Sequence, residues 1–215
     1  MKLYTFFRSS AAYRVRIALQ LKGLNYDSIP RHLRKNGGEH RSHAYLRVNP
    51  QGLIPALEVD GSVLAQSLAI IEYLDARWPT PRLLPDDTLT CARVRSLALL
   101  IACDIHPLNN LRVLNYLREI LGQNQDSVNE WYRHWIAEGF KSLEEQLHLL
   151  SSQGRYCVGD TVSLADVCLV PQVYNARRFG CDLTSYPTIQ KITAFLETLN
   201  AFAAATPEVQ PDAEE

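Results

Sequence analysis

Short apolar runs alternate with helical patterns through the first part of the chain. Residues 2–7 (KLYTFF) form an apolar, aromatic run that is typical of a β-strand. From Ala11 onward apolar residues recur at helical spacing, and Gly23 closes the pattern, so we expect a helix between them. Residues 25–31 predict a second strand, and Pro30 indicates that this strand lies at a sheet edge.

A hairpin and a helix are predicted next. In residues 56–65 (ALEVDGSVLA), two apolar runs flank Asp60-Gly61, a preferred tight-turn pair. Ser67 then opens a helical pattern that Pro79 stops. This order predicts a parallel strand pair extended by an antiparallel pair. We therefore expect an α/β domain of thioredoxin-like arrangement over residues 1–80.

Beyond residue 85 every pattern is helical. Residues 79–85 (PTPRLLP) have the composition of a linker. Pro107 is expected to kink the first helix at His106, because proline lacks the N–H and clashes with a preceding carbonyl. Ser163 and Asp166 form a capping-box pattern, and the polar tail from Pro207 is expected to be frayed. We expect an all-helical domain over residues 86–215, with helices in the ranges 88–121, 127–150, 163–179 and 187–205.

Charge and composition argue against several classes of partner. The 215 residues carry 22 Lys and Arg against 23 Asp and Glu, so the net charge of −1 offers no general attraction for nucleic acid or an anionic membrane. The apolar runs are too short to span a bilayer, and the N-terminus lacks the layout of a signal peptide, so we expect a cytoplasmic protein. Five cysteines without a CxxC pair argue against a disulfide framework or structural zinc. His40 and His43 lack a third ligand, so no metal is expected.

Hydroxyl groups stand where two helices of the first domain begin. Ser9 and Ser10 follow Arg8 at the first helix start, where a hydroxyl can donate to a thiolate or simply cap the helix. On this stretch alone the cap is the favoured interpretation. Gln66 and Ser67 begin the next helix, where the same alternatives are a carboxylate site and a plain cap.

The segment NPQGLIPAL (residues 49–57) offers a third feature between these two helix starts. A cis bond between Ile54 and Pro55 would turn the backbone N–H and C=O of Ile54 outward, where a peptide-like ligand could pair with them. A plain trans loop is the commoner alternative. Together the three features suggest a ligand with an anionic group at one end and a thiol at the other.

Two polar clusters stand out in the helical part. The first surrounds Pro107 and is a solvated kink or a binding site; its members are Asp104, His106, Asn109, Asn110 and Arg112. The second is the pair Arg177 and Arg178 near the end of a helix. These cations either complement the helix dipole or clamp a dicarboxylate substrate.

The chain resembles the zeta class of soluble glutathione transferases, which includes maleylacetoacetate and maleylpyruvate isomerases. The resemblance rests on SSAAYRVRIAL from Ser9, NPQGLIPAL, the Gln66-Ser67 pair, GDTVSLADVCLVPQV and ARRF. It implies a thioredoxin-like N-terminal domain, an all-helical C-terminal domain and a homodimer. It also makes the cis form of Ile54-Pro55 the favoured one.

The resemblance implies roles for individual residues. Ser9 would activate the thiol of glutathione, with Ser10 beside it as a second catalytic serine that could make the thiolate contact instead. Arg178 would bind the substrate carboxylate, and Arg8 would be a second clamp. The glutathione-binding set would be Ser9, Ser10, Ala11, His40, Ile54, Gln66, Ser67, Asp104 (implied to reach in from the partner subunit), His106, Asn110 and Arg112. The zeta motif has cysteine where this chain has Ala11 and serine where it has Ala12. A mechanism that needs this cysteine therefore cannot operate here, whereas glutathione brings its own thiol.

The implied activity is a glutathione-dependent cis–trans isomerisation of a maleyl keto acid to its fumaryl isomer, within aromatic catabolism. The thiolate would add to the cis double bond, and elimination after rotation would return it, so glutathione would act as a cofactor. Maleylacetoacetate and maleylpyruvate both stay open as substrates. Two alternatives also stay open: a transferase that conjugates glutathione to small electrophiles such as halogenated acids, and a non-catalytic binding module on the same fold.

Overall fold

The computed structural model describes residues 1–151 and 153–214. It divides the chain into two compact units. The first combines Met1–Arg82 with Thr198–Glu215, and the second is Leu83–Glu197.

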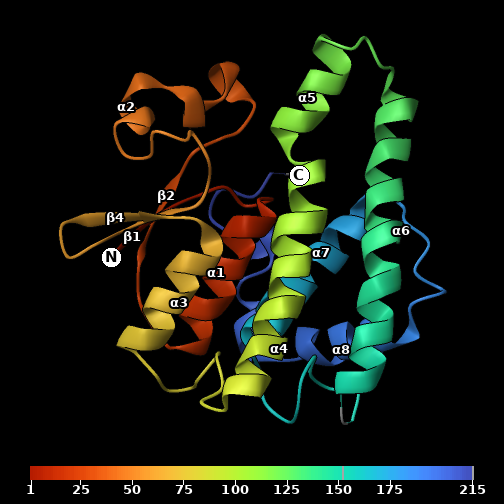
Figure 1. Cartoon of the computed structure of the whole chain (residues 1–215). Helices are drawn as coiled ribbons and strands as arrows, with labels where there is room; N and C mark the ends of the chain where they lie inside the picture. Colours follow the sequence, from red (N-terminus) through yellow and green to blue (C-terminus); the bar gives the residue numbers. More distant parts are fainter. Residues whose placement is uncertain (152, 215) are drawn as a thin grey trace. The chain divides into compact units, whose positions relative to one another are not determined.

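A mixed four-stranded sheet of order β2-β1-β3-β4 forms the centre of the first unit (Figure 1). Strand β1 (Lys2–Thr5) pairs in parallel with β2 (Asp27–Pro30) and antiparallel with β3 (Ala56–Val59). Strand β4 (Ser62–Ala65) completes the predicted hairpin with β3. Strand β2 lies at the sheet edge, as Pro30 predicted, so the expected thioredoxin-like arrangement is confirmed.

Helices α1 (Ser10–Leu21) and α3 (Ser67–Arg77) pack side by side in this unit (Figure 1). Both begin directly after a strand or its turn, so both helix N-termini lie where a strand has ended. Short helical turns connect β2 to β3: η1 (Lys35–Gly37), η2 (Glu39–Arg41) and α2 (His43–Leu46).

The second unit is helical, as expected. Its long helix α7 (Leu164–Arg178) is buried on almost every side, as its mostly apolar sequence requires. The regular α-helix before Pro107 ends at Leu99. A π-helical segment, η3 (Leu100–Ile105), follows it, and a 3-10 segment, η4 (His106–Asn109), contains Pro107, so the expected interruption is confirmed. The other elements of this unit are α4 (Thr88–Leu99), η3 (Leu100–Ile105), η4 (His106–Asn109), α5 (Leu111–Glu119), α6 (Gln125–Leu150) and α8 (Pro187–Glu197).

The predicted capping box begins α7. The Ser163 N–H donates to Asp166 Oδ2 at 2.8 Å, and the Cys157 N–H donates to Asp166 Oδ1 at 2.8 Å. Burial raises the pKa of Asp166, and the hydrogen bonds from Cys157 and Ser163 oppose that shift. Asp166 therefore ties the loop before α7 to the start of the helix, which is a structural role.

Two expectations for the C-terminal end are wrong. The pattern over residues 187–205 predicted one helix, but α8 ends at Glu197 and a separate short helix, α9 (Asn200–Ala203), follows. The tail is not frayed either, because the Phe7 N–H donates to Asp212 Oδ2 at 2.9 Å and Lys35 pairs with Glu214. These partners are remote in sequence, so no local pattern reveals them.

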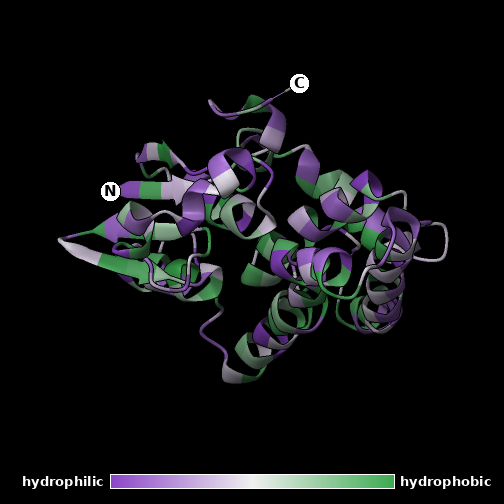
Figure 2. Cartoon of the chain, turned by 90° about the horizontal axis from the view of Figure 1, so that it is seen from above, coloured by the Kyte–Doolittle hydropathy of each residue, from purple (hydrophilic) through white to green (hydrophobic). Residues whose placement is uncertain are grey.

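Hydrophobic and hydrophilic residues are interleaved along the helices, as Figure 2 shows. This is the pattern of helices that cover an apolar core with one face. Within residues 1–151 and 153–214, no helix has both the length and the hydrophobicity needed to cross a membrane.

A buried ion pair fixes the start of the linker. The side chains of Lys22 and Asp75 are 0% and 3% exposed, and Lys22 Nζ lies 2.8 Å from Asp75 Oδ1. The same ammonium group donates to the carbonyl oxygens of Trp78 and Pro81 at 2.7 Å each. One buried cation therefore joins α1, the end of α3 and the first residues of the linker.

We expect Asp75→Ala to lower the free energy of unfolding by about 3 kcal/mol, because it leaves the Lys22 charge buried without a carboxylate. Urea unfolding followed by circular dichroism measures this. The matched control is Lys2→Ala, which removes the exposed pair of Lys2 with Glu58 and should move the midpoint far less. Equal shifts in the two variants would contradict this account of the linker.

Candidate functional site

The turn between β1 and α1 presents the Ser9 hydroxyl. The Ser9 N–H donates to the Phe6 carbonyl at 2.9 Å, and Ser9 Oγ accepts the Ala12 N–H at 3.2 Å. Ser9 is therefore the N-cap of α1, as the simpler interpretation held. A capping hydroxyl uses its oxygen as an acceptor, so its O–H remains able to donate to a second group. Capping and activation of a ligand thiol are thus compatible.

The neighbours of Ser9 differ in exposure. Ser10 is only 5% exposed, whereas Arg8, Ser9 and Ala11 are half-buried. The Arg8 guanidinium lies over the Phe7 ring, 4.7 Å from its centroid, which restricts the side chain while leaving a cation beside the helix start. Of the two serines, Ser9 is the more accessible.

Ile54 is held beside this turn by the loop that precedes β3. The Ile54-Pro55 bond is cis, which confirms the form favoured by the family resemblance. The carbonyl of Leu53 accepts the Tyr45 hydroxyl at 2.6 Å and the Asn49 Nδ2 at 2.9 Å. Burial raises the pKa of Tyr45 to about 12, so its hydroxyl stays a donor. Ile54 itself packs into the apolar cluster that flanks the turn: Tyr4, Phe6, Phe7, Ala12, Tyr45, Ile54 and Ala56.

The start of α3 is built from a strained residue and a buried one. Gln66 has a φ of 71°, a left-handed conformation that costs a non-glycine residue free energy, and such residues cluster at functional sites. Gln66 Nε2 donates to Gln51 Oε1 at 2.9 Å, which ties the helix start to the NPQG loop. Ser67 is buried, and its Oγ accepts Arg14 Nη1 at 3.4 Å. Arg14 thereby connects α1 with the beginning of α3.

His40 lies buried in η2. Its Nδ1 has no hydrogen-bond partner among residues 1–151 and 153–214. Burial lowers the pKa of His40, and the positive charge of Arg41 adds to the shift, so the neutral imidazole is favoured. Only glycine fits at position 38, because a Cβ there would lie 2.6 Å from His40 Cε1. The carbonyl oxygen of His40 also approaches Gly52, so η2 lies against the loop that carries Ile54.

The polar residues around the Pro107 kink occupy helix ends of the second unit. Asn110 is the N-cap of α5, and its Oδ1 accepts the Arg112 N–H at 3.1 Å. His106 is half-buried at the start of η4, and the Arg112 side chain is exposed. The kink is anchored to α6 because Asn109 Nδ2 donates to the Tyr132 carbonyl at 3.1 Å.

Tyr132 of α6 lies between the Pro107 kink and the segment that carries Arg178. The rings of Tyr132 and Phe179 are stacked with centroids 3.5 Å apart and planes inclined by 8°. Arg178 lies over the Phe179 ring at 4.8 Å. Burial raises the pKa of Tyr132 to about 12, and the nearby Arg178 opposes this shift. Tyr132 therefore contacts both the Pro107 kink, through Asn109, and the ring of Phe179 over which Arg178 lies.

The two arginines of ARRF have different surroundings. Arg177 Nη1 pairs with Glu197 Oε1 at 2.6 Å. Within the described ranges no carboxylate pairs with the exposed guanidinium of Arg178. Of these two arginines, Arg178 is therefore the candidate for binding a carboxylate ligand.

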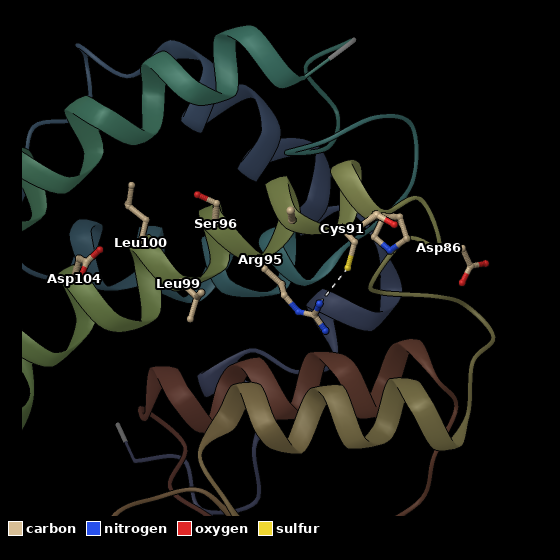
Figure 3. Close-up of a pocket in the computed structure, with 10 residues that line it drawn as sticks. Asp86, Cys91, Arg95, Ser96, Leu99, Leu100 and Asp104 are labelled. Atoms are coloured by element: carbon tan, nitrogen blue, oxygen red, sulfur yellow. Dashed lines mark hydrogen bonds between the residues drawn. The ribbon is translucent and has the colours of Figure 1, made fainter.

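A hollow of about 790 Å³ runs along α4 and η3, lined by residues between Pro85 and Asp104 (Figure 3). Asp86 and Asp104 lie toward its two ends, and Arg95 bends back so that Nη1 lies 3.4 Å from the Cys91 Sγ. Asp104 is exposed here, which is compatible with the predicted contact to a partner subunit. Among residues 1–151 and 153–214, no cluster of three or more His, Cys, Asp or Glu has the arrangement of a metal site.

Several residues of these clusters were missed by the sequence analysis. Gln51 and Arg14 lie inside the quoted motifs NPQGLIPAL and SSAAYRVRIAL, but their partners Gln66 and Ser67 are distant in sequence. The contacts of Tyr132 could not be predicted, because its place in the sequence is that of an ordinary apolar residue of α6.

A thioredoxin-like unit followed by a helical unit is the glutathione transferase fold, and the comparisons with known proteins agree. The model of the glutathione S-transferase N-terminal domain matches residues 8–77, and that of the C-terminal domain matches residues 109–202. The chain belongs to the glutathione S-transferase family.

Individual relatives are similar over almost the whole chain. A probable maleylacetoacetate isomerase of Vibrio cholerae is 56% identical over 212 residues, 98% of this chain and 97% of the relative. A bacterial maleylpyruvate isomerase of the zeta class, solved in its holo form, is 48% identical, with a TM-score of 0.96 and full coverage of both chains. The maleylacetoacetate isomerase of Methylobacterium extorquens AM1, solved with malonate and glutathione bound, is 41% identical, with a TM-score of 0.95 and full coverage of both chains. The family predicted from the motifs is therefore confirmed.

Proposed function

We propose that this chain is a glutathione-dependent isomerase that converts a maleyl keto acid, maleylacetoacetate or maleylpyruvate, to its fumaryl isomer in aromatic catabolism. The observation that carries the proposal is the turn before α1, where Ser9 Oγ accepts the Ala12 N–H. The O–H of this serine can therefore donate a hydrogen bond to an anion. The similarity to isomerases of both substrates supports the same reaction class.

The residues of the first unit fit glutathione. Ser9 would donate to the sulfur, and the backbone of Ile54 would pair with the cysteinyl part as a strand does. The γ-glutamyl carboxylate would lie with Gln66 and Ser67 at the start of α3, where the Gln66 side chain makes no capping hydrogen bond to the helix. The Nδ1 of buried His40, which has no hydrogen-bond partner in the described part of the chain, is a polar atom that a ligand group could satisfy. Ser10 and Ala11 would line the sulfur site.

When bound, glutathione supplies a thiolate that adds to the cis double bond and leaves again after the bond has rotated. The Ser9 hydroxyl favours the ionised sulfur by donating a hydrogen bond to it, and the positive end of α1 acts in the same direction. Ala11 stands where the family motif has cysteine, so the chain offers no second thiol at this position.

The residues of the second unit suit the substrate and the remainder of the cofactor. Arg178 would bind the substrate carboxylate in a bidentate manner and stabilise negative charge as it develops. Arg8, a residue of the first unit, would be a second cation. His106, Asn110 and Arg112 would complete the glutathione site. Bound malonate in the Methylobacterium relative supports dicarboxylate recognition.

The proposal also includes the assembly and location of the protein. We expect a homodimer in which Asp104 contributes to the partner's glutathione site, and we expect the cytoplasm as the location. The domain limits proposed for function are residues 1–80 for glutathione binding and 86–215 for the helical part that recognises the substrate.

The direct test supplies freshly generated maleylpyruvate and maleylacetoacetate in parallel with glutathione at a small fraction of the substrate concentration. We expect ultraviolet absorbance to report full isomerisation of at least one substrate while titrated free thiol stays constant, because glutathione is regenerated. Loss of thiol in step with substrate would indicate conjugation. Failure to isomerise either substrate would contradict the proposal.

The two arginines of ARRF provide a matched pair of variants. We expect Arg178→Ala to lower kcat/KM about 100-fold, because charge-assisted bonds to a carboxylate contribute about 3 kcal/mol. Arg178→Lys should recover only part of the loss, since lysine cannot bind in a bidentate manner. Arg177→Ala, which breaks only the exposed pair with Glu197, should change kcat/KM less than about twofold. A similar loss in both alanine variants would argue against Arg178 as the substrate arginine.

A further inference from the structure

The family motif that contains Ser9 also contains a buried arginine whose purpose the proposed reaction does not explain. Arg16 lies in α1 and is only 1% exposed. Burial lowers its pKa to about 10, and nearby negative groups that include Asp212 oppose the shift, so Arg16 remains a cation at neutral pH. A buried cation requires partners, and these identify its role.

Arg16 joins the end of β1 to the C-terminal segment. Its Nε donates to the Ala205 carbonyl at 3.0 Å and its Nη2 donates to the Phe7 carbonyl at 2.9 Å. Its Nη1 lies 3.3 Å from Thr5 Oγ1 and 3.4 Å from the Phe6 carbonyl. One guanidinium therefore bonds to the backbone just before the Arg8–Ser9 turn and to the chain just before the C-terminal tail.

The tail also binds the backbone of Phe7, at the N–H group of the same residue. The Phe7 N–H donates to Asp212 Oδ2 at 2.9 Å, so both polar groups of Phe7 are bound, one by Arg16 and one by Asp212. Glu214 pairs with Lys35 and lies 3.4 Å from His32 Nε2. His32 in turn meets the Phe6 ring edge to face, with centroids 4.9 Å apart.

We propose that residues 206–214 form a strap that positions the Phe7–Ser9 turn, with Asp212 and Arg16 as its positioning residues. The Ser9 N–H is bonded to the Phe6 carbonyl, which also receives Arg16, so a displacement of Phe6 or Phe7 is passed on to Ser9. The orientation of the Ser9 hydroxyl thus depends on a tail that begins almost two hundred residues later in the chain. Neither Asp212 nor Arg16 touches the reacting atoms in this account.

The test uses the full-length protein with Asp212→Ala, Asp212→Asn and a control, Asp182→Ala. Asp182 Oδ1 accepts the Thr184 N–H at 2.9 Å, so the control loses the same kind of carboxylate–amide bond in the other unit. Hydrogen exchange of the Phe7 amide, followed by NMR without any ligand, is the first measurement. We expect exchange at least tenfold faster in Asp212→Ala, partial recovery in Asp212→Asn because its amide oxygen still accepts, and no change in Asp182→Ala.

The second measurement concerns glutathione, and its kinetic part rests on the proposed function. We expect Asp212→Ala to weaken calorimetric binding of glutathione about tenfold and to lower kcat, while Asp212→Asn restores both in part. Unchanged exchange at Phe7, or faster exchange with unchanged glutathione binding, would overturn the strap. If the wild-type protein binds glutathione but isomerises neither maleyl acid, the proposed function fails. The strap is then still tested by the ratio of the glutathione dissociation constants of Asp212→Ala and the wild type.

Discussion

The functional arrangement of the first unit depends on where α1 begins. The helix starts at Ser10 because Ser9 caps it, and the cap brings a hydroxyl group to the positive end of the helix. Two features restrain the backbone just before Ser9. One is the apolar cluster that contains Phe6 and Phe7, and the other is the buried guanidinium of Arg16. A helix N-terminus alone is common, but one held this firmly can present a donor to a sulfur atom at a fixed distance.

Buried neighbours also hold the backbone in place at other candidate site residues. Leu53 is held by Tyr45 and Asn49, so the backbone at Ile54 is oriented before any ligand arrives. In the second unit, Tyr132 stacks on Phe179 and its backbone anchors the Pro107 kink through Asn109. These supporting residues act through others, and each of them is buried. Preorganisation of this kind removes the need to order the site when the ligand binds.

Local signals in the sequence predicted most of the fold. The hairpin at Asp60-Gly61, the edge position of Pro30 and the capping box at Ser163 each follow from a local pattern, and the structure has all of them. The C-terminal tail was predicted wrongly, because Asp212 finds its donor at Phe7 and no local pattern records a contact over that separation. Likewise the motif indicates Ser9 as a candidate residue, but it does not reveal that Arg16 donates to the carbonyl groups of Phe6 and Phe7 just before it. The sequence indicates candidate ligand-binding groups more readily than the buried residues that contact the backbone beside them.

The measurement that tests the central claim most directly is the pKa of the glutathione thiol in the complex, obtained from ultraviolet absorbance of the thiolate. Ser9→Gly removes the hydroxyl while keeping a tolerated cap residue, and Ser42→Gly does the same at α2, where Ser42 accepts the Tyr45 N–H at 3.2 Å. The account predicts a thiol pKa below about 7.5 in the wild type and in Ser42→Gly, and a value at least about one unit higher in Ser9→Gly. An unchanged thiol pKa in Ser9→Gly would contradict the claim that this hydroxyl activates the cofactor.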